Sequence, residues 1–265
     1  MLEELKGFCK KYKMENLFSS AYSIDMWFKA CHINFMTTIA TKLAEGDDNI
    51  NPELLRICCL HHDDGSALQY KQYGEFNDNK VSHYALGLDM LDHYLMAHKI
   101  SVTPQINILR ACIYYHNRIE LAGNSLDEET KKYVQLVSDA NEIEKKCLAP
   151  AGYLDHKIAN DKFYHRRPNS QADKQIRPEV FEAYENGGWT QEFFGCNSSA
   201  EEILFEATIA IECIKKYGDI AKWAMCNINC YTYSSAFTGY TQLFRRYLSR
   251  ADAERAINIM EKALN

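Results

Sequence analysis

Helical periodicity runs through nearly the whole chain and limits its fold more than any other feature. Only five prolines and twelve glycines interrupt the 265 residues, and apolar residues recur every three or four positions, as on one face of a helix. In residues 22–44 these positions are Ile24, Trp27, Phe28, Cys31, Phe35, Ile39 and Leu43. No alternating apolar and polar segment of useful length indicates a strand. The sequence therefore predicts an all-α fold.

Start and stop signals predict the bounds of individual helices. Asn51 followed by Pro52 is typical of a helix start and predicts a helix over 52–63. Glycines 65 and 74 and the turn Asn77-Asp78-Asn79 predict a loop over 65–82 with room for one helical turn. The remaining helices are predicted over 83–98, 103–117, 127–146, 178–186, 199–216, 218–231 and 234–263.

Residues 150–177 are polar and aromatic and carry few helical signals, which predicts a long loop. Two interpretations stay open for it. It is either a surface loop or a lid that brings Arg166 and Arg167 near an anionic ligand, because long ordered loops often carry function.

Composition excludes several classes of protein. The length fits one large domain or two small ones, and the formal net charge of −6 argues against an extended nucleic-acid groove, although a local cationic pocket for one phosphate group is compatible with it. The ten cysteines form no Cys-x-x-Cys pair. The first residues lack the apolar core of a secretory signal, and no run of about 18 apolar residues predicts a membrane span. We therefore expect a cytoplasmic protein with reduced thiols.

Histidines and aspartates occur in an order that indicates a metal site. The candidates, each on or at the end of a predicted helix, are His32, His62 with the adjacent Asp63, His83, His116 and Asp139. A helical bundle builds a metal site in this way, because side chains from several facing helices converge in its core.

The adjacent residues His62 and Asp63 can bind the same ion only in certain positions on a helix. Consecutive residues on a helix point about 100° apart, so both reach one ion only near a helix end or from a wide inward face. Gly65 fits such an end, and a carboxylate there can bridge two ions. The mixed nitrogen and oxygen donors suit one or two ions of Mn²⁺, Fe²⁺, Co²⁺, Ni²⁺ or Zn²⁺ better than Ca²⁺, and Mg²⁺ is also compatible.

The order His … His-Asp … Asp, with "LHHDDG" at the pair, resembles the HD superfamily of metal-dependent phosphohydrolases, which are all-helical. The segment "CLHHDDGSALQYKQYGEFNDNKVSHYALG" is similar to a bacterial subgroup with the pattern "LLHDIGRFEQ…YGTFND…SxDHAxxG". "ACIYYHNR", "LVSDANEIE" and "GDIAKWAMCNINCYTYSSAF" resemble that subgroup's "AIxNHN", "IRDADKLD" and "LAWIFDINFxxS". The resemblance spans most of residues 25–245.

The resemblance implies a set of site residues. The superfamily's four metal ligands correspond to His32, His62, Asp63 and Asp139, and the positions of a second metal correspond to His83 and His116. This chain departs from the pattern at four positions around them. Asp64 stands in place of an apolar residue, Ser66 in place of a cation near the substrate phosphate, and Ser82 in place of an aspartate. Tyr115 also replaces a polar residue. These departures indicate either altered specificity or a site that binds metal without catalysis.

Several residues keep alternative interpretations. His62 and Asp63 could form a structural ion pair, and His83 and His116 could bind a phosphate or leaving group instead of metal. His61 is expected to face away from His62.

The catalytic candidates are Asp63 and Asp64. Asp64 has two interpretations. It is a general base or a group that orients the attacking water, or it is a solvated carboxylate after a helix end. Arg118 and Lys71 are the candidate residues for binding the substrate phosphate.

These observations predict a single HD-type helical bundle over 1–265, with a metal-site core at 25–146 and additional C-terminal helices at 178–265. The expected activity is hydrolysis of a phosphomonoester or phosphodiester in a nucleotide or related small phosphorylated compound. The alternative is a metal- or nucleotide-binding HD-fold protein with reduced catalysis. A diiron oxygenase of this fold is a third class that nothing in the sequence favours. The oligomeric state is left open, with a homodimer as one alternative.

Overall fold

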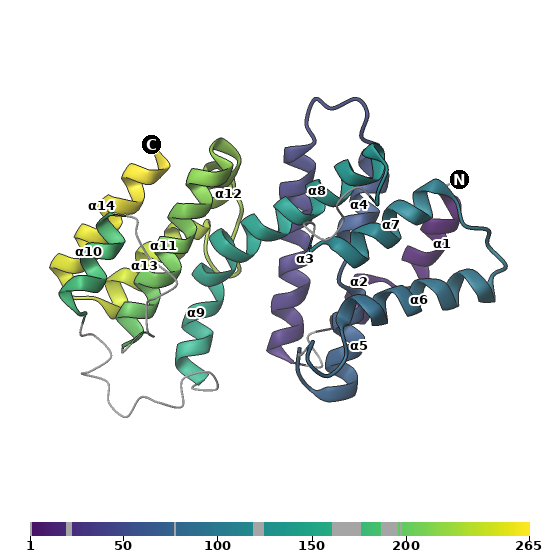
Figure 1. Cartoon of the computed structure of the whole chain (residues 1–265). Helices are drawn as coiled ribbons and strands as arrows, with labels where there is room; N and C mark the ends of the chain where they lie inside the picture. The colour runs from purple at the N-terminus through teal and green to yellow at the C-terminus, as the bar shows by residue number, and fades with distance from the viewer. Residues whose placement is uncertain are drawn as a thin grey trace. The chain divides into compact units, whose positions relative to one another are not determined.

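The computed structural model describes residues 2–19, 23–76, 78–118, 125–160, 176–186, 196 and 198–265. These residues form helices and turns, and the only β pairing among them is an isolated bridge between Cys230 and Tyr233. The predicted all-α fold is confirmed. The chain forms two compact units, Met1–Glu142 and Ile143–Asn265, which run from purple to teal and from teal to yellow in Figure 1.

The first unit is a bundle in which helices distant in sequence pack together. Its elements are α1 (Glu3–Lys11), α2 (Met14–Leu17), α3 (Ile24–Leu43), α4 (Pro52–His61), α5 (Asp64–Tyr73), α6 (His83–Ala97), α7 (Pro104–Tyr115) and most of α8 (Glu128–Ile143). Helix α3 packs on α4, α4 on α7, α7 on α6 and α6 on α5. Because only His62 and Asp63 separate α4 from α5, these contacts close a ring of helices around the end of α4.

Two helices of this ring begin at the same kind of N-terminal signal. The side chain of Asn51 accepts a hydrogen bond from the Leu54 amide, and Thr103 accepts one from the Ile106 amide. A proline occupies the first turn in both cases, where its missing N–H costs nothing. These caps explain why the predicted starts at 52 and 103 agree with the structure.

Helix α5 corrects the prediction of a loop over 65–82. Residues 64–73 are helical, and Gly65, Ser66, Ala67 and Gln69 are buried. The helix ends at Gly74, whose φ of 72° is a left-handed conformation that favours glycine. Packing against α6 stabilises a helix here despite the two glycines, because tertiary contacts override weak local propensity.

The second unit is organised around one long helix. Its elements are η2 (Glu144–Leu148), α9 (Ala149–Asn160), α10 (Pro178–Asn186), α11 (Ser199–Tyr217), α12 (Asp219–Asn227), α13 (Ala236–Tyr247) and α14 (Arg250–Leu264). Helix α11 packs against each of the others. Its N-cap is Ser198, whose hydroxyl accepts a hydrogen bond from the Glu201 amide.

Three predictions for this unit were wrong in detail. Residues 150–160 belong to helix α9 rather than to a loop, and Arg166 and Arg167 lie outside the described residues. The helix predicted over 218–231 ends at Asn227. The single helix predicted over 234–263 is two helices, because Leu248 is extended and Ser249 caps α14 by accepting from the Asp252 amide.

Over the described ranges, no helix has both the length and the apolar composition that crossing a membrane requires.

Candidate metal centre

Four histidines and one aspartate converge in the interior of the first unit. Their ligand atoms form two groups, His32–His62–Asp63 and Asp63–His83–His116, within which all atoms lie within 4.8 Å of one another. All five residues are buried, and Asp63 belongs to both groups. Five of the six ligand candidates are thus brought together from α3, the α4–α5 junction, α6 and the end of α7.

The break between α4 and α5 lets two consecutive residues reach the cluster. His62 keeps helical angles (φ −57°, ψ −25°), whereas Asp63 leaves them (φ −125°, ψ 15°), and α5 begins at the next residue. The Nε2 atom of His62 lies 3.7 Å from the Oδ2 atom of Asp63. The expected helix end at this pair is therefore present, although Gly65 lies inside α5 rather than at the end of α4.

His62 and His116 occupy equivalent positions, each directly after the last residue of a helix. The Nδ1 atom of His62 donates to the carbonyl oxygen of Cys59 at 2.7 Å, and that of His116 donates to Ile113 at 2.9 Å. A carbonyl oxygen only accepts, so Nδ1 carries the hydrogen in both rings and Nε2 keeps a lone pair in the neutral tautomer. Burial holds the pKa of His62 well below its usual value, and its Nε2 has no hydrogen-bond partner among the described residues.

His83 is oriented by a carboxylate that the sequence analysis assigned only to a polar turn. Its Nδ1 lies 2.7 and 2.9 Å from the two carboxylate oxygens of Asp78, and its backbone N–H donates to Oδ1 at 3.0 Å. Gln69 holds this turn by donating to Asp78 and to the carbonyl of Val81. The Nε2 atom of His83 is thereby directed to His116 Nε2 at 3.2 Å. The same Nε2 atom of His83 lies 3.7 Å from the Oδ1 atom of Asp63.

The turn also sets the charge of Asp78. Burial raises the pKa of Asp78, but the hydrogen bonds from the His83 backbone and ring outweigh it and lower the pKa below its usual value. The resembled pattern has an aspartate directly before this histidine, and this chain has Ser82 there. Asp78 supplies a carboxylate next to His83 instead. A carboxylate in this position fixes the tautomer and orientation of the His83 ring.

Lys29 contacts the cluster and was missed by the sequence analysis. Its ammonium forms an ion pair with Oδ2 of Asp63, while the hydroxyl of Ser66 donates to Oδ1. Burial opposes ionisation of Asp63, yet Lys29 and the surrounding histidines hold the pKa of this carboxyl well below its usual range. Lys29 lies one turn before His32 on α3, and this i, i+3 spacing could have indicated that both side chains share a face.

Asp64 belongs to a separate buried pair. Its Oδ2 lies 2.6 Å from the Nδ1 of His61, whose ring packs edge-on against Phe8 at 5.0 Å. Burial lowers the pKa of His61, but the Asp64 carboxylate outweighs this and raises it to about 10. Asp64 is 1% exposed, so its interpretation as a solvated carboxylate was wrong. Neither His61 nor Asp64 is a member of the two groups around Asp63.

Helix α8 presents Asn141, rather than Asp139, toward the cluster. The Nδ2 of Asn141 donates to the Oδ1 of Asn117 at 2.6 Å, and Asn117 in turn donates to His116 Nε2 at 2.7 Å. The carboxylate of Asp139 accepts from Gln135 at 2.8 Å and joins neither group. The buried face of α8 contains Thr130, Val134, Val137 and Asn141. This spacing of three and four could have identified Asn141 from the sequence.

The two candidate phosphate-binding residues differ in their surroundings. The guanidinium of Arg118 lies 3.3 Å from the centre of the Tyr84 ring and 4.6 Å from that of Tyr114. Tyr84 directly follows His83, and their rings are 5.8 Å apart, so Arg118 lies near the edge of the cluster. Lys71 is exposed in the last turn of α5.

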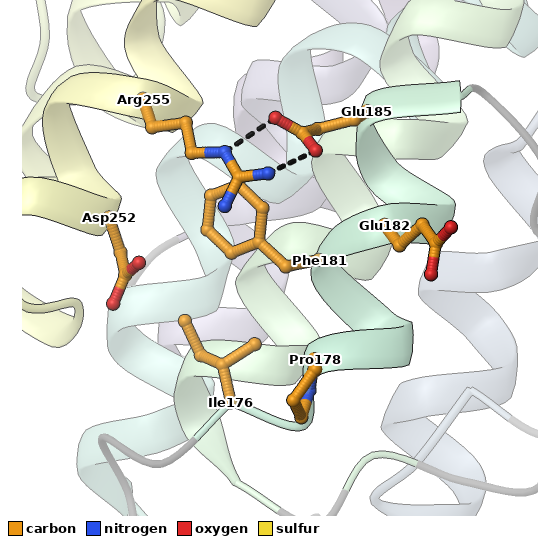
Figure 2. Close-up of a pocket in the computed structure, with 7 residues that line it drawn as sticks. All are labelled: Ile176, Pro178, Phe181, Glu182, Glu185, Asp252 and Arg255. Atoms are coloured by element: carbon orange, nitrogen blue, oxygen red, sulfur yellow. Dashed lines mark hydrogen bonds and ion pairs between the residues drawn. The ribbon is translucent and has the colours of Figure 1, made fainter.

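A pocket in the second unit contains none of the predicted site residues. It has a volume of about 530 Å³ and is lined by Ile176, Pro178, Phe181, Glu182, Glu185, Asp252 and Arg255. Figure 2 shows Arg255 paired with both oxygens of Glu185, and its guanidinium lies 4.3 Å from the centre of the Phe181 ring. The single arginine is thus already paired.

The donor set in the first unit fits a divalent transition metal. Nitrogen and oxygen ligands about 2.1 Å from one ion lie about 3.0 to 3.4 Å apart. The Nε2 atoms of His83 and His116 already have this separation at 3.2 Å, and His62 needs to approach Asp63 only slightly from 3.7 Å. Imidazole and carboxylate donors suit Mn, Fe, Co, Ni or Zn.

No protein-family model, curated protein or solved structure matches this chain.

Proposed function

We propose that this protein is a metal-dependent phosphohydrolase of the HD type, acting on a phosphomonoester or phosphodiester of a nucleotide or related small phosphorylated compound. One observation carries the proposal. The Oδ2 atom of Asp63 faces His62 and His32 at 3.7 and 4.0 Å, whereas its Oδ1 atom faces His83 at 3.7 Å. One carboxylate between two sets of imidazoles suits a centre of two ions with Asp63 as the bridge.

The residues of the cluster would hold such ions in a fixed geometry. His32 and His62 would hold one, His83 and His116 the other, with Asp63 shared between them. The hydrogen bonds from His62 to Cys59, from His116 to Ile113 and from His83 to Asp78 keep each Nε2 directed inward. Divalent ions held there supply a Lewis acid that polarises a phosphoryl oxygen.

Hydrolysis of a phosphate ester requires positive charge near the phosphate and a proton for the leaving oxygen. Water oxygen forms a new bond to phosphorus, the bond from phosphorus to the leaving oxygen breaks, and a water proton ends on that leaving oxygen. Of the two candidates for binding the substrate phosphate, Arg118 fits better, because it lies against Tyr84, whose ring is next to that of His83.

Metal analysis of the purified protein tests the proposal. We expect His62→Ala and Asp63→Ala to lose bound metal and to lose Mn²⁺-dependent hydrolysis of aryl phosphates, mononucleotides or cyclic dinucleotides. His93→Ala is a matched control, since this histidine is exposed and donates to the backbone of its own helix. Unchanged metal content and activity in both cluster variants would reject the proposal.

A second candidate function is metal or nucleotide binding without turnover. Asn141 favours it, because α8 directs a neutral amide toward the histidines instead of a carboxylate. Hydrolysis of any of the substrates above, abolished by Asp63→Ala, would exclude this candidate. Metal binding without hydrolysis of any of them would favour it.

A further inference from the structure

The ammonium of Lys29 lies on the carboxylate oxygen that the first metal group requires. Its Nζ pairs with the Oδ2 atom of Asp63, and the same oxygen faces His62 Nε2 at 3.7 Å and His32 Nε2 at 4.0 Å. The lysine side chain is 20% exposed and Asp63 is 2% exposed. The ion pair therefore forms at the inner end of a largely buried lysine.

Charge and space together prevent a divalent ion from joining this arrangement unchanged. A metal bound to Oδ2 would be about 2.1 Å from that oxygen, which places it in the volume next to the ammonium. Two like charges this close repel strongly in a buried site. Because Lys29 balances the single negative charge of Asp63, it keeps the carboxylate compensated when no metal is bound.

The lysine has an alternative position available. Its four-carbon side chain is flexible, and its Nζ already lies 5.6 Å from the centre of the Phe76 ring, which is itself 40% exposed. Movement away from Asp63 toward this ring would bring the ammonium next to a partly exposed side chain, while Lys29 stays one turn from His32 on α3. An anionic oxygen of a ligand at the metals would then be within reach.

We propose that Lys29 is a displaceable counter-ion of Asp63, which competes with the metal for this carboxylate and, once displaced, binds the anionic group of the ligand. The second half rests on the phosphohydrolase proposal, whereas the competition concerns metal binding alone. Lys29 thus holds the Asp63 carboxylate in the metal-free protein and binds the anionic ligand in the metal-bound protein.

Metal affinity measured by titration of the metal-free full-length protein with Mn²⁺ tests the competition. We expect Lys29→Met to bind Mn²⁺ more tightly than the wild type, by roughly 5- to 150-fold, the usual range for coupled sites. Lys29→Arg keeps the charge and should resemble the wild type. Lys42→Met is a matched control, because this lysine is on the same helix but pairs with Glu45 near the surface.

Thermal unfolding of the same variants guards against loss of the fold. Metal-free Lys29→Met should unfold at a lower temperature than the wild type, since Asp63 loses its counter-ion, and Mn²⁺ should raise its midpoint by more than that of the wild type. Lys29→Gln should behave in the same way. Unchanged or weaker Mn²⁺ binding in both variants would overturn the competition and leave Lys29 a purely structural partner of Asp63.

Inorganic phosphate added to protein saturated with Mn²⁺ tests the second half. We expect phosphate to bind about tenfold or more weakly to Lys29→Met than to Lys42→Met. Equal phosphate affinity would overturn the anion-binding role. Tighter Mn²⁺ binding without hydrolysis of any substrate would reject the phosphohydrolase proposal and keep the competition. If neither the wild type nor Lys29→Met binds Mn²⁺, both are rejected.

Discussion

Gly65 and His83 approach each other so closely that a side chain on residue 65 has no room. A Cβ atom added to Gly65 would lie 1.7 Å from the carbonyl oxygen of His83 and 2.6 Å from the backbone nitrogen of Gly87. Both are backbone atoms and cannot rotate away. The crossing of α5 and α6 at this glycine is what brings His83 beside Asp63, so a requirement for packing and the geometry of the candidate metal centre coincide.

Replacing Gly65 with alanine should therefore damage both stability and the site. We expect a loss of about 1 to 3 kcal/mol in the free energy of unfolding, as for overpacked cores, together with weaker metal binding because α6 must move. Denaturant unfolding and Mn²⁺ titration measure the two effects. Gly87→Ala is the comparison variant, since its Cβ would meet the Ile113 side chain at 3.1 Å, which is milder crowding than the 1.7 Å backbone contact at residue 65. Equal losses in the two variants would contradict the role of the Gly65 crossing.

Removing the carboxylate of Asp78 should weaken metal binding through His83. In Asp78→Asn the ring of His83 loses its charged partner, and loss of such partners typically reduces metal affinity about 10- to 100-fold. The helical content measured by circular dichroism should not change. Asp48→Asn, at an exposed turn residue, should have no effect on affinity. Wild-type affinity in Asp78→Asn would show that the ring orientation does not depend on this carboxylate.

The two α8 positions should respond differently to substitution. Asp139→Ala should keep the metal content, because its carboxylate accepts from Gln135 on the same helix and joins neither ligand group. Asn141→Asp should bind metal more tightly, because it adds a negative charge to the hydrogen-bonded path that reaches His116 through Asn117. Metal loss in Asp139→Ala would restore Asp139 as a ligand and contradict the assignment of Asn141 to the inward position.

The second unit depends on a charged contact at the start of α11. Glu201 is 1% exposed, and it accepts from the backbone N–H of Arg177 at 3.0 Å and from its guanidinium at 2.8 and 2.9 Å. Glu201→Ala leaves Arg177 without these acceptors and should destabilise the protein by about 1 to 3 kcal/mol in denaturant unfolding. Bound metal per folded molecule should not change, since both ligand groups belong to the first unit. A change below 0.5 kcal/mol, the size typical of surface positions, would contradict a structural role.

The periodicity of the sequence predicted the fold class and several helices within one or two residues. Helices α6, α7 and α10 agree with the predicted 83–98, 103–117 and 178–186. Apolar periodicity is a local signal, and α7 and α10 each also begin with a proline. Helix α5 was missed, since its glycines at 65 and 74 are locally typical of a loop. Only burial against α6 shows that Gly65 is required inside a helix.

The order of histidines and aspartates in the sequence indicated six ligands, and the structure brings all of them except Asp139 into the two groups around Asp63. Tertiary structure alone decided which side chains surround them. Lys29, Asp78 and Asn141 reach the cluster through an ion pair, a turn and a two-step hydrogen-bond path. The direction of a long or polar side chain depends on the neighbours that contact it after folding, and local sequence patterns do not specify which neighbours these are.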